Sequence, residues 1–197
     1  MKRFLLLLLL APLTSHADLT FTQLEAITQT PETLSGHFVQ EKYLSALDAS
    51  LESSGEFRYL RNQSIQWITR EPIQNELLMT PTSLVNTQGA QEVMRLDTSA
   101  TPALKVISHL FFSVLTAEWQ QLSRYFTLTG SLTQTLNNTR TDTPEGGQWH
   151  AELLPIDPTI KHVVSKVELN GSQLLREIIL HEPGGDRTLI RFDHLTP

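Results

Sequence analysis

Residues 163–192, VVSKVELNGSQLLREIILHEPGGDRTLIRF, carry the clearest structural signal in the sequence. They hold three runs rich in apolar and β-branched residues, separated by two turn signals: runs 163–169, 173–180 and 187–192, with Asn170-Gly171 and Pro183-Gly184-Gly185-Asp186 between them. An Asn-Gly pair between two such runs is typical of a β-hairpin with a type I′ turn, because both turn positions need a positive φ. Consecutive hairpins predict an antiparallel meander.

The same pattern extends toward the N-terminus. Further candidate strands are residues 36–44, 54–60, 65–70, 75–79, 83–86, 126–130, 132–136 and 148–154. In the last of these, Trp149, Ala151 and Leu153 alternate onto one face. A sheet of roughly nine to eleven strands must twist and curl. It can therefore close, split into a sandwich, or stay open and be covered by other elements.

Two amphipathic helices are predicted to provide such a cover. Thr20 and Gln23 form a capping box for the first helix, which Thr30-Pro31 ends. The second helix, residues 102–116, has Pro102 in its first turn. Its apolar residues occupy about half of the helical circumference: Leu104, Val106, Ile107, Leu110, Phe111, Val114 and Leu115. This apolar surface makes a ligand cavity plausible, but periodicity alone favours an ordinary filled core.

The N-terminus has the three-part layout of a secretory signal peptide. Lys2 and Arg3 are basic, residues 4–13 are apolar, and Ser15-His16-Ala17 is a small-x-small cleavage site. As a helix the apolar run would cover about 15 Å, half of a bilayer core. We therefore expect cleavage after Ala17, a single domain over residues 18–197, a periplasmic location and no membrane span.

Composition excludes several classes of protein. The chain has 197 residues, 40% of them hydrophobic, and a net charge of −6, so it is not expected to be disordered. A pI near 5.6 argues against nucleic acid as a partner. The absence of cysteine excludes disulfides, thiolate metal sites and a thiol nucleophile.

The sequence shows no motif of catalysis or cofactor binding. The histidines of the mature chain lack metal-ligand spacing and are interpreted as scattered surface residues: His37, His109, His150, His162, His181 and His194. His181-Glu182 precedes Pro183-Gly184, which cannot continue a helix. Neither a nucleophile elbow nor a P-loop is present. We therefore predict no catalytic residue, no metal site, no cofactor and no enzymatic activity.

One set of motifs resembles a known family. Arg61 lies six positions after Gly55, and Trp67 lies six positions after Arg61. Together with Phe38-Val39-Gln40, Gly55-Glu56-Phe57 and Pro72, they resemble the LolA family of periplasmic carriers of outer-membrane lipoproteins. Trp119 with Tyr125, and Leu153-Leu154-Pro155, extend the resemblance over most of the mature chain.

The resemblance implies a mainly β fold: an unclosed, strongly curved antiparallel β-barrel with a helical lid over a hydrophobic cavity. In the family this cavity holds acyl chains, and the basic residue that Arg61 matches keeps the lid closed. An inner-membrane ABC transporter loads the carrier and an outer-membrane receptor unloads it. We expect the cavity and lid to be formed by Trp67, Ile65, Phe57, Leu104, Ile107, Leu110, Phe111, Val114, Leu115 and Trp149.

Residues 86–89 depart from the family pattern. The stretch from residue 153 to 188 is more similar to a divergent LolA-like branch, whose members accompany lipid-synthesis genes and exporters, including aryl-polyene pathways. The predicted function is a monomeric carrier of acylated lipoprotein or related lipid cargo. Two alternatives remain: a non-catalytic adaptor of a lipid exporter, and a hydrolase acting on the same lipids.

Overall fold

The computed structural model of the chain describes residues 19–97, 110–133 and 147–197. The predicted signal peptide lies outside these residues. So does the first part of the predicted helix 102–116, with Leu104 and Ile107. In the described ranges, no helix combines the length and the apolar character needed to cross a membrane.

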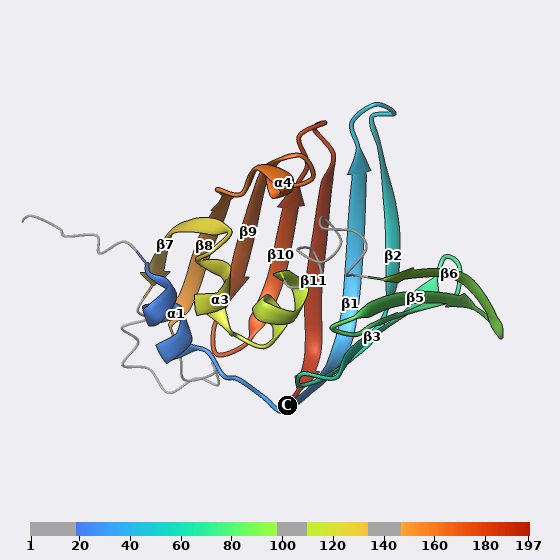
Figure 1. The fold of residues 1–197 in the computed structure, drawn as a ribbon, viewed down its shortest axis with the longest axis horizontal. Helices are drawn as coiled ribbons and strands as arrows, with labels where there is room; N and C mark the ends of the chain where they lie inside the picture. The colour runs from blue at the N-terminus through green and yellow to red at the C-terminus, as the bar shows by residue number, and fades with distance from the viewer. Residues whose placement is uncertain (1–18, 98–109, 134–146) are drawn as a thin grey trace, which may run out of the picture.

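The described strands form one 11-stranded antiparallel sheet, in the order β6-β5-β4-β3-β2-β1-β11-β10-β9-β8-β7 (Figure 1). Their bounds are β1 Thr33–Leu44, β2 Ala49–Leu60, β3 Ser64–Glu71, β4 Asn75–Met79, β5 Ser83–Gln88, β6 Gln91–Asp97, β7 Phe126–Thr133, β8 Gln148–Pro155, β9 Lys166–Gly171, β10 Leu175–His181 and β11 Arg187–Thr196. β6 and β7 lie at opposite edges and do not pair, so the sheet is open. The predicted fold class, an unclosed and curved antiparallel sheet, is confirmed.

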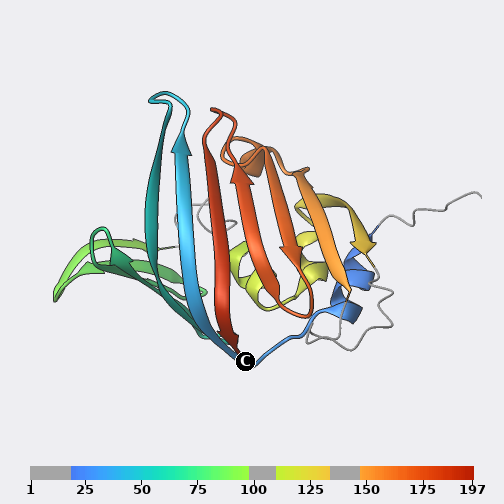
Figure 2. The ribbon, with the colours of Figure 1, turned by 180° about the vertical axis from the view of Figure 1, so that it is seen from behind.

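The sheet consists of two meanders joined at one place. Strands β1–β6, the N-terminal half, pair with their chain neighbours, and so do strands β7–β11, the C-terminal half. Among the described strands, β1 and β11 are the pair whose backbone hydrogen bonds join the halves. Figures 1 and 2 show β5 and β6 running across the direction of β1, so the N-terminal half curls strongly.

The helices lie over the C-terminal half of the sheet (Figure 1). α1, Phe21–Ile27, begins at Thr20 with the predicted capping box and buries Leu24 completely. It packs against α3, Trp119–Leu122. Residues 110–115, the described part of the predicted second helix, are helical, and α4, Pro158–Lys161, is capped by Asp157.

The predicted turn at Asn170-Gly171 is wrong, although the hairpin exists. β9 continues through Gly171, which pairs with Leu175, and residues 172–174 form the loop. Neither Asn170 nor Gly171 has a positive φ. Gly171 is needed instead for close packing, because a Cβ atom there would lie 2.6 Å from the Trp149 ring.

Two other strands differ from the predicted pattern. β6 was not predicted, because its polar residues hide its alternation. β7 is one continuous strand to Thr133 where the sequence suggests a break at Gly130. The strand needs a glycine at position 130, because a Cβ atom there would come within 2.2 Å of the His150 carbonyl oxygen.

Candidate functional site: the inner face of the N-terminal half

The inner face of the sheet, on which the helices lie, carries two rows of side chains across the N-terminal half. In the first row, residues directly opposed on β2 to β6 are Phe57, Trp67, Leu77, Asn86 and Met94. In the second row they are Tyr59, Ile65, Met79, Leu84 and Leu96. Directly opposed residues of antiparallel strands share a face, so each row is a continuous ladder of contacts. We call these residues the inner rows.

Exposure rises along both rows toward the sheet edge. Phe57 on β2 is 1% exposed and Ile65 on β3 is 2% exposed. Trp67 and Leu77 are half-buried, whereas Met94 and Leu96 on β6 are 36% and 37% exposed. The inner rows therefore lead from the hydrophobic core to an apolar rim that water reaches.

An aromatic cluster lies at the buried end of the inner rows. Trp67 stacks on Phe38 with ring centroids 3.9 Å apart, and contacts Phe192 edge-on at 6.1 Å. Phe57 meets Phe192 edge-on at 5.2 Å. Strands β1, β2, β3 and β11 contribute one ring each, so the cluster spans the junction between the two halves. Such geometries are favourable beyond the apolar area that they bury.

Two buried polar atoms on the inner rows lack a well-formed hydrogen bond. Among the described residues, these are the Tyr59 hydroxyl and the Asn86 Oδ1 atom, and the backbone of Asn62 makes only a weak polar contact with the Tyr59 hydroxyl. Burial raises the pKa of the Tyr59 phenol to about 12, so this hydroxyl keeps its proton at neutral pH. An unpaired buried polar atom is costly, and one beside an apolar surface is available to a polar group of a ligand.

The helix over residues 110–115 contributes the other predicted lid residues. Leu110, Val114 and Leu115 are buried, and Phe111 is half-buried against the core. Beside this helix lies a small opening of about 50 Å³, lined by Ser113, Gln121, Leu122, Arg124 and Tyr125. Its volume is far below that of a pocket for a drug-sized ligand, which is on the order of 300 Å³ or more.

Trp149 lies apart from the other predicted cavity residues. It is 2% exposed, meets Trp119 edge-on at 5.6 Å, and donates from Nε1 to the Ser172 carbonyl oxygen at 2.6 Å. These contacts place it in the packed core of the C-terminal half. The structure thus brings Phe57, Ile65 and Trp67 together on the inner rows and separates Trp149 from them.

Arg61 follows β2 and binds the segment between α1 and β1. Its guanidinium donates to the carbonyl oxygens of Thr30 and Pro31, from Nη2 to Pro31 at 3.0 Å, and lies 3.4 Å from the Glu32 carboxylate. Its backbone N–H donates to the Glu32 carbonyl oxygen at 2.9 Å. The predicted latch residue therefore holds the chain that leads from α1 into the sheet.

Sequence reasoning missed several residues of this face. Phe192, Leu77 and Asn86 were not among the predicted site residues, and Phe38 was quoted only as part of a motif. Strand alternation could have placed Leu77 on the face of Met79. Phe192 could not be added from the local pattern, because its contact depends on the pairing of β11 with β1.

No protein-family model matches this sequence, and no curated protein sequence matches it significantly. Several solved structures are similar to it at low sequence identity. It is similar to a LolA superfamily protein from Nitrosomonas europaea, with 13% identity, coverage of 89% of this chain and 90% of that chain, and a TM-score of 0.43.

Two further similarities concern proteins from other bacteria. In a MucA/MucB complex from Pseudomonas aeruginosa, identity is 14%, coverage is 89% of this chain and 55% of that chain, and the TM-score is 0.48. For a domain described as an outer membrane lipoprotein-sorting protein from Vibrio parahaemolyticus, identity is 7%, coverage is 89% of each chain, and the TM-score is 0.43. We therefore argue the function from this chain's own residues.

Proposed function

We propose that the protein is a periplasmic carrier that binds acyl chains of lipoproteins or related lipids on the inner rows. The observation that carries this proposal is the ladder of opposed side chains from Phe57 to Met94 on an open sheet, apolar at every position except Asn86. An extended acyl chain needs such a surface, since contact with apolar walls requires no directional chemistry. Hiding a C16 chain from water is favourable by on the order of 10 kcal/mol, at about 0.8 kcal/mol per methylene.

The unpaired polar atoms support a lipid with a polar head. Tyr59 Oη is a donor and Asn86 Oδ1 an acceptor, and both lie on strands of the inner rows. A lipid ester or amide has polar groups that could pair with them. The role is non-catalytic: the inner rows supply contact and hydrogen bonding, with no nucleophile activated by a base.

Loading requires part of the inner surface to become accessible. Phe57 and Ile65 are almost fully buried, so cargo must displace what covers them. We propose Arg61 as the latch, because its hydrogen bonds to Thr30 and Pro31 tie the segment that follows α1. A few such bonds are worth a couple of kcal/mol, which suits a switch. In this proposal an inner-membrane transporter loads the carrier and an outer-membrane acceptor unloads it.

A matched pair of variants tests the binding face. Leu77 and Leu78 are adjacent, half-buried residues of β4 that point to opposite faces. We expect Leu77→Asp to abolish uptake of a fluorescent fatty acid and Leu78→Asp to retain it, with both variants folded by circular dichroism. Equal uptake by two folded variants would contradict binding on the inner rows.

Native mass spectrometry of the protein isolated from the periplasm without detergent tests the cargo and the predicted cleavage after Ala17. Adducts that fragment to lipid or acylated peptide are expected. A non-catalytic exporter adaptor is the second candidate, and the filled core around Trp149 and Trp119 favours it. A protein that carries no adduct and takes up no fatty acid would be such an adaptor.

A further inference from the structure

The seam between β1 and β11 contains an irregularity on the outer face. His37 pairs with Asp193 and Ser35 pairs with Thr196, so β11 places one residue more than β1 between these two pairs. His194 takes up the extra length with a left-handed φ of 48°. Such a bulge changes the direction of side chains and often lies beside functional sites. Here it breaks the alternation, so Asp193 and His194 project on the same face.

Gly36 makes this bulge possible. It lies on β1 between Ser35 and His37, where a Cβ atom would come within 2.7 Å of Leu195 and 2.8 Å of the Asp193 carbonyl oxygen. A larger residue would push β11 away at this point. The sequence therefore permits the close approach that brings His37 next to Asp193 and His194.

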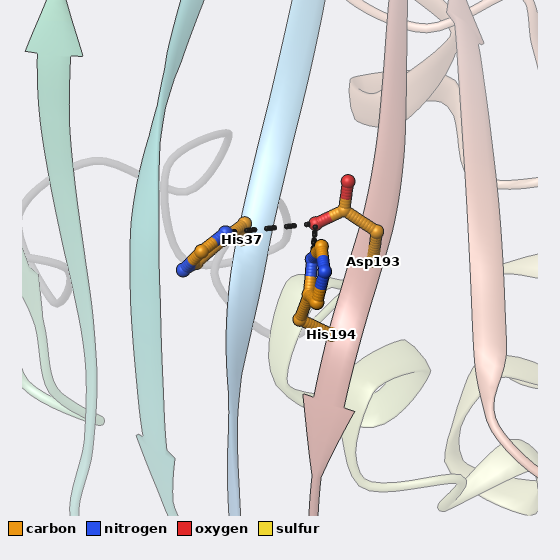
Figure 3. Close-up of side chains that lie close together, drawn as sticks. All are labelled: His37, Asp193 and His194. Carbon is orange, nitrogen blue, oxygen red and sulfur yellow. Dashed lines mark hydrogen bonds and ion pairs between the residues drawn. The ribbon is translucent and has the colours of Figure 1, made fainter.

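The three side chains form a compact and accessible cluster (Figure 3). Asp193 Oδ1 lies 3.0 Å from His194 Nδ1 and 3.9 Å from His37 Nδ1, and potential ligand atoms of all three residues lie within 4.8 Å of one another. The side chains of His37 and Asp193 are each 59% exposed, and that of His194 is 75% exposed. Small rotations of exposed side chains can therefore bring these atoms around a common centre.

We infer that His37, Asp193 and His194 bind a divalent transition-metal ion of the zinc type. Two imidazole nitrogens and one carboxylate oxygen are a donor set that suits zinc, whereas magnesium and calcium prefer oxygen ligands alone. Zinc holds such ligands at about 2.0–2.2 Å, and three protein ligands leave a position for water or another group. The cluster borders a pocket of about 240 Å³, which Glu56, Arg58 and Thr196 also line.

The ion would connect the two halves of the sheet. His37 lies on β1 and the other two ligands lie on β11, and among the described strands these two pair across the junction of the halves. The unfolded chain does not hold these residues together, so metal binding would favour the folded state. This site lies on the face opposite to the inner rows and is independent of the proposed lipid site.

Calorimetric titration of zinc into the protein, purified without a polyhistidine tag, tests this site. We expect saturable binding of one ion, weakened at least about tenfold by His37→Ala or Asp193→Asn, since even residues behind metal ligands change affinity by this amount. His181→Ala is the matched control: His181 also contacts a carboxylate, Glu168, at 2.7 Å, but lies outside the cluster. It should bind zinc as the unaltered protein does.

Thermal unfolding provides the second readout. Zinc should raise the melting temperature of the unaltered protein and of His181→Ala, and at the same zinc concentration raise those of His37→Ala and Asp193→Asn by clearly less. Circular dichroism shows whether each variant is folded. Both cluster substitutions change exposed side chains, so if one variant fails to fold, the other still tests the site. The absence of zinc binding, or binding of equal strength in the folded cluster variants, would overturn the proposal.

Discussion

In the part of the chain that the structure describes, the buried side-chain polar atoms of the C-terminal half are paired, whereas two in the N-terminal half are not. In the C-terminal half, Trp149 Nε1 donates to the Ser172 carbonyl oxygen, and Trp119 Nε1 donates to Thr28 Oγ1 at 2.7 Å. Among the described residues, the unpaired atoms are Tyr59 Oη and Asn86 Oδ1, both on strands of the N-terminal half. The C-terminal half thus has the hydrogen bonding expected of a well-packed core. The N-terminal half keeps unused hydrogen-bonding groups beside an apolar surface.

Packing follows the same division. Leu153, Val167 and Leu169 on β8 and β9 are completely buried, while every residue of β6 is exposed. The two halves therefore use one sheet architecture for different purposes: one half provides stability, and the other provides a surface. The experiments below test this division, beginning with the largest expected effect.

Two tryptophans give the strongest test of the division. Trp149→Ala should lower the free energy of unfolding by about 3–5 kcal/mol, since it leaves a cavity over Gly171 and an unpaired carbonyl at Ser172. Trp67→Ala should cost less, about 2 kcal/mol, because Trp67 is half-buried and mainly loses its stacking on Phe38. Urea denaturation followed by circular dichroism measures both. Equal losses would mean that the halves do not differ in this way.

Two glycines test whether the stability cost of a substitution depends on the strand's position in the sheet, central or edge, as well as on the half in which it lies. A Cβ atom on Gly55 would lie 1.9 Å from the Ile68 carbonyl oxygen, and one on Gly130 would lie 2.2 Å from that of His150. β2 is paired on both sides, whereas β7 is an edge strand that can shift. We expect Gly55→Ala to cost about 2–3 kcal/mol and Gly130→Ala about 1 kcal/mol in urea denaturation. A larger loss for Gly130→Ala would contradict this interpretation.

The buried hydroxyl of Tyr59 predicts a loss of stability at high pH. Its pKa rises from 10.0 to about 12 in the folded protein, so between these values the folded state keeps a proton that the unfolded chain releases. The free energy of unfolding should therefore fall as pH rises through this range, by about 2 kcal/mol. Urea titrations near both ends of the range measure this. Tyr59→Phe should show a smaller fall, and an identical fall would assign the effect to other groups.

Local sequence signals predicted much of the fold. Thr20 and Gln23 define a capping box, and the alternation of Trp149, Ala151 and Leu153 gives the buried face of β8. The Asn170-Gly171 pair correctly indicated a hairpin but not the position of its turn. Gly171 is required by its close contact with the Trp149 ring, and a short stretch of sequence around Gly171 does not contain Trp149. Tertiary packing decided what turn chemistry alone could not.

The candidate sites depended more strongly on pairing between distant strands. The shared face of Phe57, Ile65 and Trp67 could be predicted because they lie on neighbouring strands, and their role in binding lipid stays a prediction. The positions of Phe192 and the histidine cluster could not be predicted, because β1 and β11 lie near opposite ends of the described sequence. His37 and His194 therefore looked like isolated surface residues. The left-handed conformation of His194, which places it beside Asp193, has no signature in the sequence.

The strand order also has a consequence for folding kinetics. Each half pairs strands that follow one another in the sequence, and such local pairing closes at a lower entropic cost than pairing between distant strands. The β1–β11 seam requires closing a loop that includes all the other strands, and non-local pairing of this kind slows folding. The two meanders can thus precede the seam, which makes the docking of β1 on β11 the natural rate-limiting step. Until that step, both strands would present unpaired edges to other chains, so the seam is also where newly made protein is most exposed to aggregation.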